Sequence, residues 1–342
     1  MKKKMFDKLK SIRNYCMIAN SFDAKFAFIG IGHHSLQNLY PIINYLHLSL
    51  KTVCLTNKAK ANLIKQRWGI NTTTDILDIL EDEEIKGVFV SIHPQKHFEI
   101  ARKVIMAGKN LFIEKPPCSN LQELEQLIDL AQKYHVHVVV GMQRRYSPAV
   151  NTLKKKLDKH KPISYRLHYT TGSYPEGNPL LDLFIHPLDM VCYLFGEAKI
   201  SYKKRIRTFY GGETLLLALE HTTTNGLIEL STAYSWNNLQ EELCVNTEEG
   251  MYRLEKNEIV TFSPFKKPIL GLPIEKIRQI PETLVFLQKS TCNIPTINNN
   301  QLYTQGYYLE IETFALLSCN KKGKSLSSFH ALKPTYNLLK EL

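Results

Sequence analysis

The stretch that decides the fold is Lys25-Phe26-Ala27-Phe28-Ile29-Gly30-Ile31-Gly32-His33-His34-Ser35. Its apolar run is too continuous for a half-exposed strand, and it ends in Gly-x-Gly just before apolar residues that recur at helical spacing. The glycines therefore lie where a buried strand turns into a helix, the place at which a dinucleotide pyrophosphate rests on a helix N-terminus. The residues that we expect to bind it here are Gly30, Gly32, His33 and His34. Ser35 takes the third position of the G-x-G-x-x-G/A fingerprint, where it is small enough for close helix packing.

Strands and helices alternate after this turn. Buried strands are expected at residues 51–56, 87–92, 111–113 and 136–141, and helices at 58–68, 75–80 and 120–134, with a threonine-rich turn at 72–74. This alternation indicates a doubly wound parallel sheet, an N-terminal Rossmann domain. We place this domain at residues 23–145, after a basic arm at 1–22 whose apolar residues are spaced as in a short amphipathic helix.

The end of the second strand carries Thr56, Asn57 and Lys58, where an acid would normally bind the ribose 2′-hydroxyl. A carboxylate is absent, and Lys58 and Lys60 are suited to pair with a 2′-phosphate. The pattern favours NADP over NAD; the alternative is that both lysines are simply solvated.

Two further strand ends carry polar residues. The run Leu111-Phe112-Ile113 stops at Glu114-Lys115, and Pro116 and Pro117 prevent further ladder hydrogen bonds. In an open α/β sheet ligands bind at this edge. The preceding strand ends near His93, Pro94 and His97, which we group with Glu114 and Lys115 as cofactor-binding candidates.

The pattern changes from about residue 150. Runs at 163–169, 214–219 and 227–234 resemble strands without helices between most of them, which indicates an antiparallel sheet. We therefore expect a second α+β domain at 146–342 that binds substrate and whose sheet is largely antiparallel.

Between these strands, Asp182, His186 and Asp189 stand at i, i+4 and i+7 and would share one helix face. Pro187 makes the region irregular, because it removes a hydrogen bond or marks a helix start. By spacing alone a surface charge pair, a metal site and an acid-base constellation stay open.

The formal charge of +12 is scattered apart from the N-terminal lysines, with no nucleic-acid signature, so we expect a solvated surface and no nucleic-acid partner. Seven separated cysteines without C-x-x-C fit reduced thiols in a cytoplasmic protein and argue against a zinc site. The sequence contains no run of 18 apolar residues, the length needed to span a membrane.

Taken together, these stretches resemble the Gfo/Idh/MocA family of nicotinamide-dependent oxidoreductases, the family of glucose-fructose oxidoreductase and inositol dehydrogenase. The likeness is carried by Gly30-x-Gly32, the turn from Pro94 to His97, Glu114-Lys115-Pro116, the run from Gly141 to Pro148, and Asp182-x-x-x-His186-x-x-Asp189. It covers residues 24 to about 200 well.

The resemblance implies roles for these residues. Lys115 would contact the nicotinamide ribose and the reacting hydroxyl, with His186 and Asp182 over the substrate carbon, so these three are the catalytic candidates. Histidine titrates in the range suited to accept a hydroxyl proton, and a lysine can hold the oxygen as charge develops. The substrate-binding candidates are Lys115, Arg144, Arg145, Tyr146, Asp182, His186 and Asp189. Hinge packing is an equally good account of the two arginines and Tyr146.

The expected function is hydride transfer between NADP or NAD and a secondary hydroxyl or ketone of a sugar, cyclitol or nucleotide-linked sugar, with no metal. The alternatives are a non-catalytic nucleotide-binding sensor or scaffold, and a reductase of a non-sugar ligand such as a linear tetrapyrrole. Exposed apolar strands in the second domain would suit a homodimer or homotetramer formed through its sheet.

Overall fold

The computed structural model describes residues 4–11, 22–273, 276, 282–288 and 300–342. Residues 4–11 form a helix, and the rest of the predicted N-terminal amphipathic helix lies outside the described residues. The chain divides into two compact units, each assembled from more than one segment. The first unit is the chain up to Glu114, Asp129–Val139 and Ile311–Ser325; the second is Lys115–Ile128, Val140–Glu310 and Leu326–Leu342. The predicted domain limits at residues 22 and 145 stay predictions.

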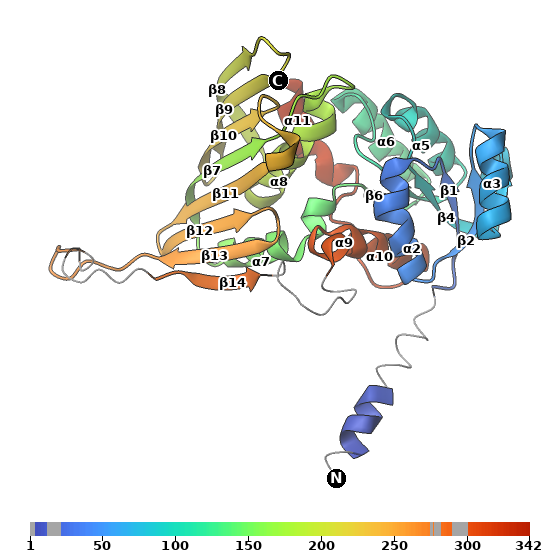
Figure 1. Cartoon of the computed structure of the whole chain (residues 1–342), viewed down its shortest axis with the longest axis horizontal. Coiled ribbons are helices and arrows are strands. Elements are labelled where there is room, and N and C mark those ends of the chain that lie inside the picture. Colours follow the sequence, from blue (N-terminus) through green and yellow to red (C-terminus); the bar gives the residue numbers. More distant parts are fainter. Residues whose placement is uncertain (1–3, 12–21, 274–275, 277–281, 289–299) are drawn as a thin grey trace. The chain divides into compact units, whose positions relative to one another are not determined.

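The first unit is built on a six-stranded sheet in the order β3-β2-β1-β4-β5-β6 (Figure 1). Neighbouring strands from β3 to β5 pair in parallel. The order reverses between β1 and β4, which makes their carboxyl ends the switch point where such sheets bind ligands. The strands are β1 (Lys25–Ile29), β2 (Ser49–Cys54), β3 (Asn71–Thr73), β4 (Ile85–Val90), β5 (Asn110–Ile113) and β6 (Val138–Val140).

Helices alternate with these strands, as the apolar periodicity predicts. They are η1 (Ser35–Leu39, a π-helical turn), α2 (Tyr40–Tyr45), α3 (Lys58–Trp68), α4 (Leu77–Leu80), η2 (Pro94–Lys96), α5 (His97–Met106) and α6 (Leu121–Lys133). Five fully buried phenylalanines form the aromatic core, with Phe89 next to Phe26, Phe28, Phe112 and Phe314 at centroid distances of 4.9 to 5.8 Å. The predicted turn at 72–74 is wrong, because Asn71–Thr73 pairs with β2 as the edge strand β3.

The second unit is built on an eight-stranded sheet in the order β14-β13-β12-β11-β7-β10-β9-β8, seen as adjacent arrows in Figure 1. Its neighbouring strands pair antiparallel except for β7 with β10, which confirms the largely antiparallel sheet. The strands are β7 (Pro162–Thr170), β8 (Ala198–Arg207), β9 (Glu213–His221), β10 (Asn225–Ser231), β11 (Gln240–Thr247), β12 (Gly250–Glu255), β13 (Ile259–Pro264) and β14 (Leu284–Gln288).

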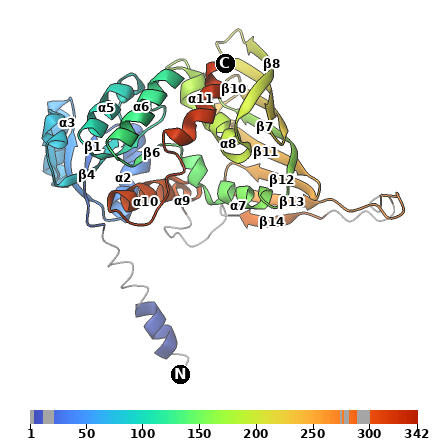
Figure 2. The ribbon, with the colours of Figure 1, turned by 180° about the vertical axis from the view of Figure 1, so that it is seen from behind.

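Helices of the second unit cover one face of this sheet (Figure 2). α11 packs against α8 and β8, and α7 packs against β12 to β14. The helical elements are η3 (Gln143–Tyr146), α7 (Pro148–Leu157), η4 (Leu180–Phe184, a π-helical turn), α8 (Ile185–Phe195), η5 (Trp236–Asn238), α9 (Gln301–Thr304), η8 (His330–Leu332) and α11 (Lys333–Lys340). The helix α10 (Tyr307–Ser318) belongs to the second unit up to Glu310 and to the first unit from Ile311. The fold class predicted from the sequence is therefore confirmed.

Candidate functional site

The surroundings of Gly30 and Gly32 differ in the space that they leave for a side chain. Gly30 has φ +81°, and a Cβ there would lie 2.4 Å from Ile92 Cγ2 and 2.5 Å from the Ser91 carbonyl oxygen. The fold itself therefore requires Gly30. A Cβ on Gly32 would meet nothing within 4 Å. The open space beside Gly32 fits a group from outside the chain, as expected where a backbone approaches a pyrophosphate.

Ser35 can take the third fingerprint position because its hydroxyl group is hydrogen-bonded within the turn. Its buried hydroxyl accepts a hydrogen bond from Gly32 N at 2.9 Å and donates to Gly32 O at 3.0 Å. The serine side chain thus adds two hydrogen bonds to the turn, which Gly or Ala at this position could not make. The departure from the fingerprint is therefore compatible with a glycine turn of the same kind.

His34 and Glu114 come together although 80 residues separate them. His34 Nε2 lies 3.1 Å from Glu114 Oε1, and His34 Nδ1 lies 3.1 Å from Asn38 Nδ2. Because the Asn38 amide nitrogen donates, Nδ1 accepts and Nε2 carries the proton that is donated to Glu114. Both residues were cofactor-binding candidates. Their contact joins the glycine turn after β1 to the end of β5.

The end of β2 is open to solvent. Thr56, Asn57 and Lys58 are exposed, and Asn57 accepts a hydrogen bond from Lys60 N at 3.0 Å as the cap of α3. Within the described ranges, neither Lys58 nor Lys60 lies within 4.0 Å of a carboxylate oxygen.

The residues after β4 divide into exposed and buried ones. His93 is exposed and Pro94 opens η2. His97 is 1% exposed and its Nε2 lies 3.1 Å from the Ile92 carbonyl oxygen, so this ring packs within the unit rather than facing solvent.

Lys115 contacts the segment that carries the other catalytic candidates. It follows β5, half-buried, and its peptide bond to Pro116 is cis. Its Nζ donates to the main-chain oxygen of Asp182 at 2.5 Å. Sequence reasoning predicted that Lys115 and Asp182 meet, but not that the lysine would use the peptide oxygen.

Asp182 also caps the start of its own helix. Asn178 Oδ1 accepts from Leu180 N at 3.0 Å, and the Asp182 carboxylate accepts from Asn178 N at 2.9 Å. Burial first, and then the Asp182 carboxylate, raises the pKa of the nearby Tyr174 hydroxyl. The sequence could have indicated these hydrogen bonds at the helix start, since Asn followed by an acid in the first turn is typical of a helix N-terminus.

Asp182 and Asp189 lie on either side of a change in helical period. Asp182 lies in the π-helical turn η4, whereas His186 and Asp189 lie in α8, so the constant α-helical period assumed for the three does not hold. Asp189 is 1% exposed and pairs with Arg145, which is 3% exposed: Arg145 Nε lies 2.8 Å from Oδ2 and Nη2 lies 2.6 Å from Oδ1. In the part of the chain that the structure describes, no group of three or more His, Cys, Asp or Glu side chains is arranged to hold a metal ion.

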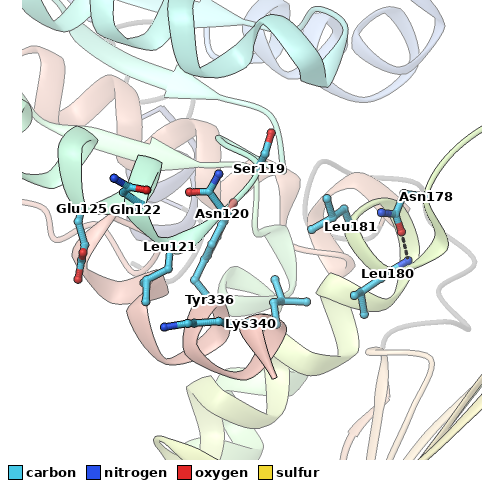
Figure 3. A pocket seen from close by; sticks show the side chains of 11 residues that line it. Ser119, Asn120, Leu121, Gln122, Glu125, Asn178, Leu180, Leu181, Tyr336 and Lys340 are labelled. Atoms are coloured by element: carbon cyan, nitrogen blue, oxygen red, sulfur yellow. Dashed lines mark hydrogen bonds between the residues drawn. The ribbon is translucent and has the colours of Figure 1, made fainter. Parts of the chain in front are cut away.

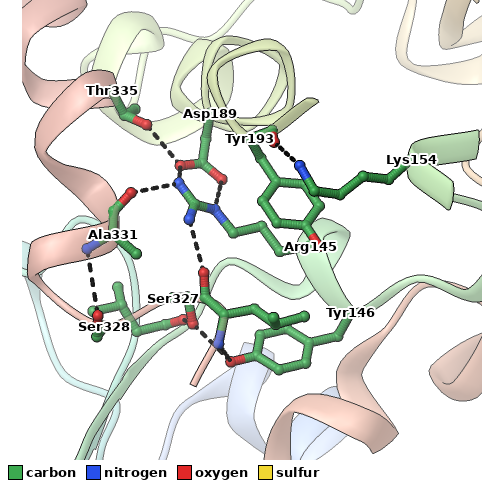
Figure 4. A network of polar contacts seen from close by, with 11 residues as sticks. Arg145, Tyr146, Lys154, Asp189, Tyr193, Ser327, Ser328, Ala331 and Thr335 are labelled. Carbon is green, nitrogen blue, oxygen red and sulfur yellow. Dashed lines mark hydrogen bonds and ion pairs between the residues drawn. The ribbon is translucent and has the colours of Figure 1, made fainter. Parts of the chain in front are cut away.

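Arg145 is the centre of the buried network in Figure 4. Besides Asp189, it donates to the carbonyl oxygens of Leu326 at 2.8 Å and Ala331 at 3.1 Å, and Thr335 donates to Asp189 Oδ1 at 2.8 Å. Nearby, the Tyr146 hydroxyl accepts from Leu326 N at 2.9 Å. These contacts favour packing over substrate binding for Arg145, Tyr146 and Asp189.

Arg144 has a buried partner as well. Its Nη1 lies 2.7 Å from Glu241 Oε1, and its guanidinium lies over the Tyr169 ring at 5.3 Å. The Arg144 and Glu241 side chains are 10% and 7% exposed. This pair joins η3 to β11 and again favours packing.

A cavity of about 480 Å³ lies beside these motifs in the second unit (Figure 3). Leu180 and Leu181, just before Asp182, form one side, and Ser119 and Asn120, shortly after Lys115, form another. Its lining does not include Lys115, Asp182 or His186. No sequence pattern indicated this cavity, because part of its lining, Tyr336 and Lys340, comes from the distant helix α11.

The described part of the chain adds two further observations. No helix in it is long and apolar enough to cross a membrane. Cys54, Cys118, Cys192, Cys244 and Cys319 are free thiols, and burial raises the pKa of both Cys118 and Cys192 to about 12. Cys16 and Cys292 lie outside the described residues.

Comparison with known proteins gives a match between residues 24–142 and the model of an oxidoreductase family with an NAD-binding Rossmann fold. An uncharacterised oxidoreductase of Escherichia coli, YhhX, is 29% identical over 139 residues, which cover 37% of this chain and 40% of the relative. The scyllo-inositol 2-dehydrogenase (NAD(+)) of Bacillus subtilis is 27% identical over 179 residues, covering 48% of this chain and 51% of the relative. The chain thus spans about half the length of these curated relatives.

A dehydrogenase (MviM) of Clostridium difficile has a similar solved structure. It superposes with a TM-score of 0.77 at 17% identity, covering 93% of this chain and 98% of that chain. At 17% identity this likeness shows the fold alone. It covers residues of both units.

Proposed function

We propose that this chain, which belongs to the Gfo/Idh/MocA oxidoreductase family through residues 24–142, transfers hydride between a nicotinamide dinucleotide and a secondary hydroxyl or ketone of a sugar, cyclitol or nucleotide-linked sugar. The observation that carries the proposal is the hydrogen bond from Lys115 Nζ to the Asp182 oxygen. It holds the strand-end lysine on the segment that contains His186, although 67 residues separate Lys115 from Asp182.

The nicotinamide dinucleotide, when bound, supplies the hydride acceptor or donor. The residues that fit its pyrophosphate are those of the Gly30 to Ser35 turn, by the open space at Gly32. Exposed Lys58 and Lys60 at the start of α3 favour NADP, because they can pair with a 2′-phosphate and no acid stands at the end of β2. The other cofactor candidates are His33, His34, Thr56, Asn57, His93, Pro94, His97 and Glu114.

The protein's own residues act on the hydroxyl proton and on the oxygen of the substrate. Oxidation of an alcohol leaves a protonated carbonyl unless a base takes the hydroxyl proton, and we assign that base to His186. The Lys115 ammonium holds the substrate oxygen as charge develops on it. We assign Asp182 a supporting part, in which its carboxylate fixes the helix start and its peptide oxygen holds Lys115.

Binding and turnover test the proposal in sequence. A thermal-shift screen with NAD, NADP and a panel of sugars, cyclitols and nucleotide sugars identifies ligands, because a ligand of the native state raises the unfolding midpoint. Lys115→Ala and His186→Ala should then each lower kcat by about 10²- to 10⁴-fold while cofactor affinity stays near that of the parent. Turnover of both variants at the parental rate would show that the roles are misassigned. Failure to bind either reduced cofactor at high micromolar concentration, in a fluorescence titration, would favour the non-catalytic sensor.

Location and assembly are part of the same proposal. The free cysteines fit a reducing cytoplasm. Apolar side chains more than half exposed on the second sheet, Ile163, Tyr202 and Leu227, fit a homo-oligomer formed through that sheet, for which sedimentation would give the mass.

A further inference from the structure

The second unit contains another cavity, apart from the one in Figure 3, and this one is lined by two arginines. Its volume of about 480 Å³ lies within the range of small-molecule sites. One wall is formed by Tyr174 and by residues 177–179, just before η4. The other wall consists of the end of β8, the start of β9 and the turn between them, and it carries Arg205 and Arg207.

Both arginines belong to the face of the sheet that the helices cover. Arg205 stands opposite Leu215 of β9, which is part of the buried core. Because side chains alternate along a strand, Arg207 lies on the same face as Arg205, and Lys204 lies on the opposite face. The two guanidinium groups therefore line one side of the cavity together.

The charges that line this cavity do not cancel. The carboxylate in the lining is that of Glu213, whose Oε2 lies 3.2 Å from Arg205 Nη1. Among the residues that the structure describes, no carboxylate oxygen lies within 4.0 Å of the Arg207 side chain. Arg207 thus differs from Arg144 and Arg145, which each pair with a buried carboxylate. One positive charge is left in excess at the cavity.

The opposite wall is joined to Asp182. Asn178 N donates to the Asp182 carboxylate at 2.9 Å, and a Cβ on Gly177 would lie 2.4 Å from Asp182 Oδ2. A substrate held near Asp182 can therefore extend along this wall toward Arg207. The turn that faces it is open as well, because a Cβ on Gly211 would meet nothing within 4 Å.

We propose that this cavity is a subsite for a phosphoryl group of the substrate and that Arg207 is its main ligand, so that the substrate is a phosphorylated or nucleotide-linked sugar or cyclitol. A guanidinium group binds phosphate oxygens through parallel N–H donors and stays charged at any relevant pH. A phosphoryl group fills only part of about 480 Å³, which leaves room for the atoms attached to it. The subsite stands on the cavity and its charges; its assignment to the substrate rests on the proposed function.

The first test measures binding without turnover. The full chain, without cofactor, is titrated calorimetrically with glucose 6-phosphate, UDP-glucose, glucuronate and glucose. We expect at least one phosphoryl probe to bind at least tenfold more tightly than both glucuronate and glucose, and the tighter of the two probes shows whether a terminal phosphate or a diphosphate is preferred. Equal affinities for glucuronate and the phosphoryl probes would overturn the phosphoryl assignment. Absence of saturable binding of both phosphoryl probes at millimolar concentration would overturn the subsite.

Three variants test whether the binding occurs at this cavity. Arg207→Met should weaken the tighter phosphoryl probe at least tenfold, as expected when a hydrogen bond to a charged group is lost. Lys204→Met is the matched control, because it removes the same charge from the opposite face of the same strand, and it should stay within twofold of the parent. Glu213→Gln should tighten binding at least threefold by releasing Arg205, a gain that unfolding cannot produce. Equal affinities of the parent and folded Arg207→Met would overturn the subsite.

The second test uses the substrate found by the ligand screen. Arg207→Met should raise KM at least tenfold and leave kcat within twofold, since Arg207 would hold a part of the substrate that does not react. Phosphoryl binding that depends on Arg207, in a chain that turns over no sugar or cyclitol with either cofactor, would support the subsite and overturn the proposed function. Turnover that depends on Lys115 but is unaffected by Arg207→Met would support the proposed function and overturn the subsite.

Discussion

Replacement of Asp189 by asparagine tests whether the buried Arg145–Asp189 pair is structural. The two side chains are 3% and 2% exposed and are joined by two hydrogen bonds of 2.6 and 2.8 Å. Two unit charges about 4 Å apart attract by about 4 kcal/mol at an effective dielectric of 20. Removing one partner of a buried pair costs about 3–5 kcal/mol, because the other charge stays buried. Since asparagine keeps one acceptor oxygen, we expect a loss of about 3 kcal/mol in the free energy of unfolding.

Urea unfolding followed by far-UV circular dichroism measures this loss. The matched control is Glu99→Gln, which breaks the exposed Glu99–Lys103 pair and should change stability by less than about 0.5 kcal/mol. The double variant Arg145→Met, Asp189→Leu should recover most of the loss, since apolar residues can replace a buried ion pair. A loss below about 1 kcal/mol in Asp189→Asn, together with weaker substrate binding, would refute the packing interpretation and restore Asp189 as a substrate residue.

Two further predictions concern the glycine turn and a buried histidine. Gly30→Ala should destabilise the fold by more than about 1 kcal/mol, because its Cβ would lie 2.4 Å from Ile92 Cγ2 at a φ of +81°. Gly32→Ala should leave the urea midpoint unchanged and weaken cofactor binding at least tenfold. Equal cofactor affinities of the parent and Gly32→Ala would contradict the assignment of Gly32 to the cofactor site. Burial lowers the pKa of His221 from 6.5, so its unfolded form binds more protons below that pH. Its contribution should be fully present above pH 6.5 and decline as the pH falls, by up to about 1.4 kcal/mol per unit. The stability difference between parent and His221→Gln, measured in urea at pH 7.5 and 5.5, should shrink at the lower pH; a constant difference would count against it.

The parallel sheet was predictable because β1, β4, β5 and β6 contain apolar runs and helical patterns lie between the strands. β3 was not, since Asn71–Thr73 is short and polar and becomes a strand only by pairing with β2. The second sheet was predictable in kind, from alternating runs such as β7, but its order was not, because pairing of β7 with β10 and β11 is decided by long-range contacts.

The candidate site was predictable where it depends on local pattern. Gly30, Ser35 and Lys115 lie at the strand ends that the sequence marks. The relation of Asp182 to Asp189 was not predictable, because η4 changes the helical period between them and Arg145 reaches Asp189 from 44 residues away. A helical wheel assumes a constant number of residues per turn, and the π-helical turn η4 departs from that number.

The contacts of Arg145 also set an order of events during synthesis. Two of its acceptors, the carbonyls of Leu326 and Ala331, follow it by 181 and 186 residues. At about 5–20 residues per second, they emerge roughly 10–40 s after the arginine. During that interval the nascent second unit holds a guanidinium that its native core cannot yet satisfy, so this unit completes its packing only when the segment 326–335 has been made. A ribosome stalled before Leu326 should therefore present a protease-sensitive second unit.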